Sequence, residues 1–442
     1  MTTSSKYLIV GGGIAADAAV RGIRSLDREG RITVLSSELH APYDRPPLSK
    51  GLWRGKPIRS IWRNTEEKGI DLRLGISAMG GDLASHRIVD SVGEVHVFEK
   101  LLLATGGVPR RLPSAAPYVV YLRTLDDYYS IRAHADQKRE FIVIGGGFIG
   151  SEIAAALAAQ ACRVTILFPE SGIGARMFPA SLSEFLNDYY RDCGVTVLPF
   201  EKVSSVARTG DRLQVITASG KMLRADSVIA GLGVAPQTGL ASALGLAVGD
   251  GIEVDKHLRT SAPDIYAAGD VANFHSQALG YRLRVEHEDN AIAMGTVAGH
   301  NMAGHLEQYD HVPFFYSDLF DLGYEAVGRL SGDMEVVEAW EEPLRKGVIY
   351  YLLEDRIQGV LLWNTWNQVD SARELLGRKF RPTYVAGHKA PVAGGGGNAF
   401  RRRIRSRHSR PGGAGRRGRD TYSGIAVAMR LTQHPCVTPP GK

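Results

Sequence analysis

Cysteine is scarce in this chain: only Cys162, Cys193 and Cys436 occur among 442 residues. No two of them have CxxC or CxxxxC spacing, which excludes a disulfide framework and a redox-active thiol pair in sequence. No apolar run approaches the ~18 residues of a transmembrane helix. The N-terminal residues also lack the basic segment and long apolar stretch of a secretory signal. We therefore expect a cytoplasmic protein without a membrane span, whose chemistry does not use a dithiol.

A net positive charge is absent outside the C-terminal tail. Residues 391–442 hold eleven of the 53 Lys and Arg residues but one of the 47 Asp and Glu residues, so the remainder carries 42 basic and 46 acidic groups. The Gly/Arg-rich composition of residues 386–442 predicts a disordered basic tail. Two interpretations stay open for it: an arm that binds acidic surfaces such as nucleic acid, or an extension without a role, including an out-of-frame end of the gene.

A strand, glycine turn, helix and strand follow one another twice, at residues 6–35 and 141–168. Each copy has a short apolar run, three glycines and an alanine-rich segment, and the copies are 134 residues apart. The duplication predicts an α/β fold with two Rossmann-like, doubly wound domains. Three further apolar runs end in small residues, as expected where parallel strands open onto a ligand crevice: residues 101–104, 227–230 and 265–268.

The first glycine turn has the dinucleotide-binding pattern Gly11-x-Gly13-x-x-Ala16. Gly11 permits the tight turn, Gly13 lets the backbone approach a pyrophosphate, and Ala16 keeps the helix close to the strand. The helix N-terminus offers free N–H groups to the phosphates. Glu38, which follows the second strand 22 residues beyond Ala16, is the acid expected to hold the ribose hydroxyls.

The second turn has the complete pattern Gly145-x-Gly147-x-x-Gly150. Its expected ribose-binding acid is Glu170, 20 residues beyond Gly150. A carboxylate there accepts a hydrogen bond from a 2′-hydroxyl and repels a 2′-phosphate, which favours NADH. Arg176 is close in sequence and would soften that preference by tolerating a phosphate.

Two such motifs in one chain predict two dinucleotides, namely a tightly held FAD and an exchangeable nicotinamide cofactor, with hydride passing between them. The alternative is an ATP or nucleotide-sugar binder with a duplicated fold. Residues 314–376 change to alternating strands with a final helix at 369–376, which predicts a small C-terminal α+β domain. The expected domains are FAD-binding (1–115 and 242–313), NAD(P)-binding (116–241), C-terminal (314–385) and the tail (386–442).

The segment Pro42–Lys50 combines three prolines with Asp44, Arg45 and a lysine that can pair with a buried acid beside a flavin. Leu48–Lys50 predicts the start of a helix, and a solvated surface loop is the alternative. No metal site is expected, because the histidines at 275, 287, 300 and 305 lack the spacing of a zinc ligand set.

PYDRPPLSK after a GGGxAA turn, Ala104–Gly107, GGGFIGSE at 145–152 and Ala267–Asp270 carry a resemblance. Over residues 6–378, the chain resembles the ferredoxin-reductase and apoptosis-inducing-factor branch of the FAD-dependent pyridine nucleotide oxidoreductases. Several segments, among them Arg284–His287, are more similar to the apoptosis-inducing-factor side.

The resemblance implies roles for individual residues. FAD would be held by Gly11, Gly13, Ile14, Ala15, Ala16, Asp17, Ser37, Glu38, Arg45, Lys50, Ala78, Thr105, Gly106, Arg123, Gly269 and Asp270. The nicotinamide cofactor would be held by Gly145, Gly147, Phe148, Ile149, Gly150, Glu152, Glu170, Arg176, Gly233 and Glu286, and the cofactor-binding set also includes His287, Glu288 and Tyr316. Phe148 would lie over the flavin where the nicotinamide enters, Glu152 would pair with Lys50, and His287 would lie near both rings.

Two departures from the family pattern stand out. Ser37 occupies the position where the family often has glutamate, with Glu38 following, and Tyr316 stands where tryptophan is usual. The thiols that pass electrons to disulfides or peroxides in related enzymes are missing, and Cys162 and Cys193 are expected to be buried structural residues. Electrons would therefore leave the flavin directly.

The expected function is an FAD-dependent NAD(P)H oxidoreductase, with NADH preferred, that passes electrons to a one-electron carrier such as ferredoxin or rubredoxin. One alternative is an NADH sensor resembling apoptosis-inducing factor, with a long-lived charge-transfer complex. Another is an NADH:quinone or oxygen oxidoreductase. The sequence leaves the oligomeric state open between monomer and homodimer.

Overall fold

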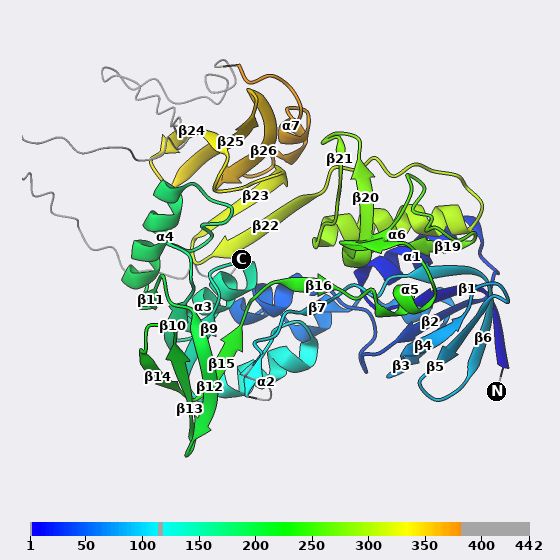
Figure 1. Cartoon of the computed structure of the whole chain (residues 1–442), viewed down its shortest axis with the longest axis horizontal. Helices are drawn as coiled ribbons and strands as arrows, with labels where there is room; N and C mark the ends of the chain where they lie inside the picture. Colours follow the sequence, from blue (N-terminus) through cyan, green and yellow to red (C-terminus); the bar gives the residue numbers. More distant parts are fainter. Residues whose placement is uncertain (1, 114–117, 382–442) are drawn as a thin grey trace, which may run out of the picture.

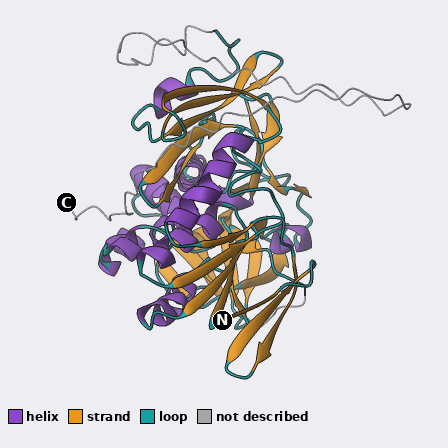
Figure 2. Ribbon diagram, turned by 90° about the vertical axis from the view of Figure 1, so that its left-hand side faces the viewer, coloured by secondary structure: helices purple, strands orange, loops and turns teal. Residues whose placement is uncertain are grey.

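The computed structural model describes residues 2–113 and 118–381. The expected tail at 386–442 and the last residues of the expected C-terminal domain lie outside the described residues. Figure 1 shows an N-terminal lobe, a second lobe and an antiparallel sheet that lies above the second lobe. Figure 2, turned by 90°, shows helices gathered in the middle of the molecule and strands toward both ends. The α/β fold class predicted from the sequence is confirmed.

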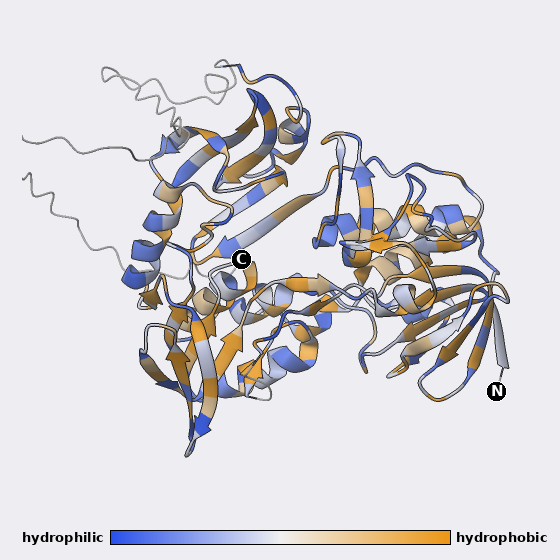
Figure 3. Ribbon diagram, viewed as in Figure 1, coloured by the Kyte–Doolittle hydropathy of each residue, from blue (hydrophilic) through white to orange (hydrophobic). Residues whose placement is uncertain are grey.

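The N-terminal lobe contains a seven-stranded sheet. Its strands are β1 (Thr2–Val10), β2 (Ile32–Ser36), β3 (Asp71–Leu74), β4 (Ala78–Asp82), β5 (Arg87–Asp90), β6 (Val95–Leu103) and β19 (Ile265–Ala267). The order β3-β2-β1-β6 is parallel, β19 pairs in parallel with the end of β6, and β5 and β4 extend the sheet antiparallel. β2 and the carboxyl-terminal halves of β1 and β6 are buried, as strands covered on both faces are, and Figure 3 shows orange residues in this sheet.

Two helices of this lobe, α1 (Ile14–Leu26) and α6 (Glu288–Met302), pack backbone against backbone. A Cβ atom on Gly295 would lie 2.3 Å from the Ala15 carbonyl oxygen, and one on Gly299 would lie 2.3 Å from that of Ala19. The close approach therefore requires glycine at both positions. It fixes the middle of α6 beside the first turns of α1.

The second lobe repeats the parallel arrangement. Its sheet has the order β11-β10-β9-β15-β8, with β8 (Val119–Val120), β9 (Glu140–Ile144), β10 (Arg163–Leu167), β11 (Thr196–Leu198) and β15 (Ser227–Ala230). Its helices are α2 (Leu125–Asp136), α3 (Phe148–Ala159) and α4 (Ala180–Asp192). The sequence analysis did not predict the antiparallel meander β12 (Val203–Thr209), β13 (Arg212–Thr217) and β14 (Met222–Ala225), whose strands are short and partly exposed.

The remaining elements connect the lobes or flank them. Figure 1 shows the antiparallel pair β7 (Gly107–Pro109) and β16 (Val234–Pro236) running between the lobes. The others are α5 (Gly239–Ala243), η5 (Gly269–Val271), and the strands β17 (Val248–Gly249), β18 (Gly251–Glu253), β20 (Ala272–Ser276) and β21 (Tyr281–Leu283). None of the helices in the described ranges is both long and apolar enough to cross a bilayer.

The C-terminal part is a five-stranded antiparallel sheet of order β22-β23-β26-β25-β24. It comprises β22 (Phe314–Leu319), β23 (Leu322–Gly328), β24 (Glu335–Glu342), β25 (Lys346–Leu353), β26 (Arg356–Trp363) and the helix α7 (Val369–Arg373), which ends three residues before the predicted helix does. Phe178 of the second lobe packs edge-on against Tyr324 and Trp363 of this sheet, at centroid distances of 5.4 and 5.6 Å. One continuous core thus joins the sheet to the second lobe.

The helix predicted to begin at Leu48–Lys50 is wrong. Four 3₁₀ turns occupy this region: η1 (Pro46–Leu48), η2 (Gly51–Arg54), η3 (Ile58–Ile61) and η4 (Thr65–Lys68). Lys50 separates the first two with φ −129° and ψ −95°, outside the helical region. Its side chain makes a buried ion pair with a residue of α3, described below, and this tertiary contact outweighs the local helical tendency.

Candidate functional site

A cleft of about 1640 Å³ lies between the two lobes. Its lining includes the last residue of β1 and the residues directly after β6, β9, β15 and β19, as the small residues after the apolar runs predicted. Single-ligand pockets usually measure about 300–1,000 Å³, so the cleft has room for two dinucleotides.

The first glycine turn has the geometry that a pyrophosphate requires. Gly11 has φ +123°, and a Cβ atom there would lie 2.1 Å from the Ala104 carbonyl oxygen. Gly13 is the N-cap of α1, has no side-chain cap, and would place a Cβ atom in open space. The first N–H groups of α1 therefore have no side-chain acceptor and can donate to an anion at the cleft.

The second glycine turn repeats this arrangement. Gly147 is the N-cap of α3, again without a side-chain cap, and open space surrounds the position of its missing Cβ atom. A Cβ atom on Gly150 would lie 1.9 Å from the Gly145 carbonyl oxygen, so Gly150 allows close packing of the helix on the turn. Both turns thus fit the phosphates of a dinucleotide.

Most of the predicted site residues line the cleft, and Ala16, Asp17 and Gly150 do not. Asp17 is fully buried, and its carboxylate accepts hydrogen bonds from Arg63 Nε and Thr65 Oγ1, both at 2.6 Å, and from Arg21. Its own N–H donates to the Gly13 carbonyl oxygen. The prediction that Asp17 contacts FAD is corrected: its polar groups are committed to anchoring α1 to the 63–65 segment.

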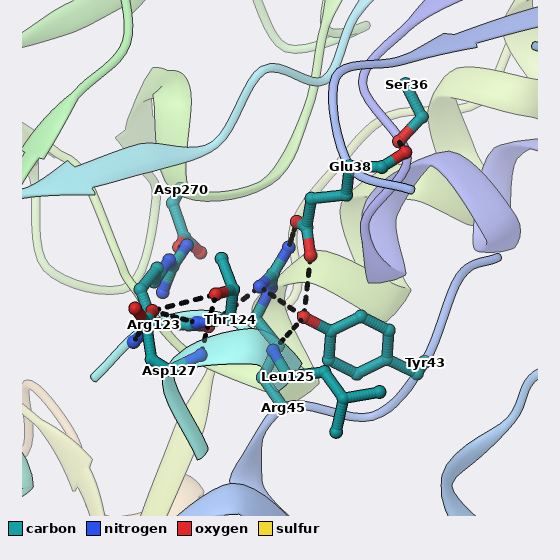
Figure 4. A network of polar contacts seen from close by, with 9 residues as sticks. All are labelled: Ser36, Glu38, Tyr43, Arg45, Arg123, Thr124, Leu125, Asp127 and Asp270. Atoms are coloured by element: carbon teal, nitrogen blue, oxygen red, sulfur yellow. Dashed lines mark hydrogen bonds and ion pairs between the residues drawn. The ribbon is translucent and has the colours of Figure 1, made fainter. Parts of the chain in front are cut away.

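A polar network links the first ribose-binding candidate, Glu38, to Asp270, which also lines the cleft (Figure 4). Tyr43 donates to Glu38 Oε2 at 2.6 Å, and Arg45 pairs with the other carboxylate oxygen of Glu38. Arg45 also donates to the Arg123 carbonyl oxygen at 2.8 Å, and Arg123 pairs with Asp270 at 2.7 Å. The network holds Glu38 and Asp270 in place across 232 residues of sequence.

Lys50 and Glu152 form a buried ion pair on the cleft wall. Lys50 Nζ lies 2.7 Å from Glu152 Oε1, and the two side chains are 11% and 2% exposed. Ser317 donates to Oε1 and Ser49 to Oε2 of Glu152, both at 2.6 Å. Both oxygens of the carboxylate are therefore hydrogen-bonded, as a buried charge requires. The expected pairing of Lys50 with Glu152 is present in the structure.

Rings from α3, from β22 and from His287, the N-cap of α6, meet beside this pair. Phe148 contacts His287 edge-on at 5.9 Å, and His287 stacks on Phe315 at 4.5 Å. Lys50 Nζ lies 5.1 Å from the centre of the Tyr316 ring. Phe148 is 37% exposed, which leaves its ring accessible from the cleft.

Two ring side chains of this group are held in their uncharged forms. Burial lowers the pKa of His287 to about 4, with the Lys50 charge acting in the same direction and Asp270 opposing it. Burial, and then the charges of Glu288 and Glu152, raise the pKa of Tyr316. At neutral pH the imidazole is neutral and the phenol is protonated.

At the far end of the cleft, Arg176 pairs with Glu170. The guanidinium places Nε 2.6 Å and Nη2 2.5 Å from Glu170 Oε1, while the Arg176 side chain is 84% exposed. Similarly, Glu286 accepts from Arg284 Nη1 at 2.6 Å, and Arg284 also reaches the Asp270 carbonyl oxygen at 3.1 Å.

The sequence analysis missed several residues that position the site. Ser49 and Ser317 fix Glu152, and Arg284 connects Glu286 to Asp270. Serine and arginine are too common for a signal without the fold, although Ser49 lies within the proline-rich segment. Of the cysteines in the described ranges, Cys162 is buried as expected but Cys193 is half-buried, and neither lines the cleft.

A cleft that two uncapped glycine-turn helices share, with a buried Lys–Glu pair between them, defines the class of two-dinucleotide oxidoreductases. The chain belongs to the pyridine nucleotide-disulphide oxidoreductase family, whose model matches residues 5–295. A second model, of the C-terminal domain of mitochondrion-associated apoptosis-inducing factor, matches residues 334–378. The chain is thus an FAD-dependent NAD(P)H oxidoreductase, and the resemblance drawn from the sequence is confirmed.

Relatives of two kinds are similar to this chain. Apoptosis-inducing factor 1, mitochondrial, of Dictyostelium discoideum is 32% identical over 84% of this chain and 78% of that protein. The 5,5′-dehydrodivanillate O-demethylase ferredoxin reductase subunit of a Sphingobium species is 34% identical over 79% and 88%. The crystal structure of the covalent putidaredoxin reductase–putidaredoxin complex aligns with a TM-score of 0.82 and 29% identity, covering 88% of this chain and 97% of that one.

Proposed function

We propose that this protein oxidises NADH and passes electrons one at a time to a small iron–sulfur carrier of the ferredoxin type. The observation that carries the proposal is the composition of the cleft: both dinucleotide turns open onto it, and neither cysteine of the described ranges lines it. Because the part of the chain that the structure describes places no thiol on the cleft lining, electrons leave the flavin directly in this proposal. The names of the ferredoxin reductase subunit and of the putidaredoxin complex support this acceptor class.

For FAD, we assign the pyrophosphate to the first turns of α1 and the adenosine ribose to Glu38. Arg45 and Tyr43 use one lone pair on each Glu38 oxygen, and a carboxylate oxygen has a second one for a ribose hydroxyl. Arg123 and Asp270 form the wall nearest the flavin end. The remaining FAD-binding assignments are Gly11, Gly13, Ile14, Ala15, Ser37, Ala78, Thr105, Gly106 and Gly269, all on the cleft lining.

For the nicotinamide cofactor, we assign the pyrophosphate to the first turn of α3 and the adenosine ribose to Glu170. The Arg176 guanidinium already neutralises part of the Glu170 charge, so rejection of a 2′-phosphate is weakened but not abolished. Gly233 and Glu286 line the cleft between this end and the flavin end.

Bound FAD supplies the hydride-accepting and electron-transferring chemistry, and the protein supplies alignment. Phe148 and Tyr316 flank the space in which the rings must meet, and Phe148 has to move for the nicotinamide to enter. Lys50 keeps a fixed positive charge there because Glu152 and the two serines hold its partner in place. The His287 ring also faces this space, and because it is uncharged it adds no second positive charge beside Lys50.

Anaerobic titration with NADH, followed by addition of oxidised ferredoxin, tests the proposal. We expect the flavin absorbance to bleach at about one NADH per flavin, because one hydride carries two electrons. The absorbance should return promptly when the oxidised carrier is added. A flavin that NADH does not bleach would refute the proposal.

A second candidate is an NADH sensor, and the match of residues 334–378 to the apoptosis-inducing-factor model favours it. A sensor would show a long-wavelength absorbance band that persists in air, slow electron delivery to ferredoxin, and a change from monomer to homodimer on NADH addition. Light scattering with and without NADH measures that change. A constant mass with fast ferredoxin reduction would leave the reductase as the function.

A further inference from the structure

The C-terminal sheet supplies part of the cleft wall, at the end of β23. Gly328, Arg329 and Leu330 line the cleft there. The Arg329 N–H donates to the Gln358 carbonyl oxygen at 2.7 Å. Its own carbonyl oxygen packs against Gly359, where a Cβ atom would lie 2.2 Å away. The backbone of Arg329 is therefore fixed to β26, while its side chain is exposed on the cleft lining.

The segment that follows Arg329 is tied to the second glycine turn. The Gly332 N–H donates to the Arg176 carbonyl oxygen at 2.9 Å. Two residues before Arg176, the Gly174 N–H donates to the Gly146 carbonyl oxygen at 2.8 Å. Two backbone hydrogen bonds thus connect the Arg329 segment with the turn from which α3 begins. The C-terminal sheet and the N-terminus of α3 therefore border the same part of the cleft.

The other basic side chains of the cleft lining already have partners. They are paired with an acid or placed over a ring: Arg45 with Glu38, Lys50 with Glu152, Arg123 with Asp270, Arg176 with Glu170, Arg284 with Glu286, and Arg111 over Tyr121. Within residues 2–113 and 118–381, the Arg329 guanidinium has neither kind of partner. Its planar fork of N–H donors, which matches phosphate oxygens, is thus available to an anionic ligand.

Tyr281 shows the direction in which the Arg329 side chain extends. Tyr281 belongs to β21, lines the cleft and is half-buried. Burial raises the pKa of its phenol, and the positive charge of Arg329 opposes that effect. A charge acts on a phenol in this way only from nearby. The Arg329 side chain therefore extends from the C-terminal sheet toward β21, over the cleft.

We propose that Arg329 binds the diphosphate of the nicotinamide cofactor, so that the C-terminal sheet holds a ligand that α3 holds from the other side. This deepens the proposed function and rests on it. The first N–H groups of α3 donate to the diphosphate, and the Arg329 guanidinium supplies the side-chain charge that a glycine turn lacks. At the ribose end of the cofactor, Arg176 is already present beside Glu170. The diphosphate is therefore the anionic group that needs a further cation.

Ligand binding to the full-length FAD holoprotein tests this proposal. Calorimetry gives the Kd of ADP-ribose, which carries the diphosphate without the nicotinamide, and the Kd of NAD⁺ and NADP⁺. The variants are Arg329→Ala and Arg329→Lys. Arg378→Ala is the matched control, because Arg378 is an exposed arginine of the same C-terminal part outside the cleft lining.

We expect Arg329→Ala to raise the Kd of ADP-ribose and of NAD⁺ about tenfold, as for the loss of one charge-assisted hydrogen bond. The factor should be the same for NADP⁺, because the diphosphate is common to both coenzymes. Arg329→Lys should recover most of the affinity, since it keeps the charge, and Arg378→Ala should bind like the wild type. Added salt should weaken binding less in Arg329→Ala than in the wild type. FAD content and urea unfolding should match the wild type, because Arg329 is exposed.

Unchanged affinity for ADP-ribose in Arg329→Ala would overturn the proposal, and so would an equal loss in Arg378→Ala. A loss confined to NADP⁺ would assign Arg329 to a 2′-phosphate and overturn it as well. A wild-type protein that binds no NAD⁺, or whose flavin NADH does not reduce, would refute the proposed function itself. The two failures are therefore distinguishable.

Discussion

Glu152 lies at the centre of a three-way contact in which Lys50 Nζ and the hydroxyls of Ser49 and Ser317 all reach its carboxylate within 2.7 Å. It joins the 46–54 segment, α3 and β22, which belong to different parts of the molecule. Lys50→Met would leave this carboxylate buried without a counter-ion. We expect the free energy of unfolding to fall by about 3 kcal/mol, as for other broken buried pairs.

Urea unfolding of the purified holoprotein measures that loss, with Lys56→Met as the control, since Lys56 is an exposed lysine two residues beyond that segment. Equal stability of the two variants would mean that the buried pair contributes no more than a surface charge. Slower flavin reduction by NADH in Lys50→Met alone would further support the fixed charge beside the flavin.

His287 should make stability depend on pH in the mildly acidic range. Its pKa is 6.5 in the unfolded chain and about 4 in the folded protein, because burial disfavours the charged ring. Between these values the unfolded state binds the extra proton, so the wild type loses stability as pH falls from about 6.5 to about 4, by up to about 3 kcal/mol. His287→Gln lacks this proton, and the difference between the two unfolding curves across pH isolates it. A difference that is constant with pH would contradict the depressed pKa.

The Glu170–Arg176 pair should set the coenzyme preference. Glu170→Ala removes the acceptor for the adenosine ribose, and we expect the KM for NADH to rise about tenfold. Arg176→Ala should leave the Glu170 carboxylate without its positive partner, and should therefore raise the KM for NADPH more than the KM for NADH. Steady-state kinetics with both coenzymes check this, and Arg208→Ala, an exposed arginine of the same lobe outside the cleft, is the control. An unchanged KM in Glu170→Ala would remove that residue from the site.

Asp17 should contribute to the free energy of unfolding and not to the binding of FAD. Asp17→Asn would leave Arg63 and Arg21 without their buried partner, and we expect a loss of about 3 kcal/mol in urea unfolding. Burial acts to raise the pKa of Asp17, but hydrogen bonds from Arg21, Thr65 and Arg63 outweigh it and lower the pKa. Its stabilisation is therefore present above the unfolded pKa of 3.8 and is lost as pH falls through the lower folded value. A lowered FAD content of the purified protein at unchanged stability would contradict the structural role.

The two dinucleotide-binding turns were predictable from the sequence because their information is local. Each glycine acts only on the backbone within a few residues of itself, as Gly11, Gly13, Gly145 and Gly147 do. The apolar run before each turn forms the strand that leads into it. The expected Lys50–Glu152 pair came from a family resemblance and not from spacing, which says nothing about residues 102 positions apart.

Tertiary structure alone decided which polar groups face the cleft. It committed Asp17 to Arg63 and Thr65, brought Ser317 of β22 to Glu152 of α3, and stacked His287 on Phe315. The sequence by itself determined the class of fold, the two glycine turns and the lack of a dithiol. Side-chain partners from separate lobes depend on how the lobes pack, and that packing is set by the whole core and not by any single segment.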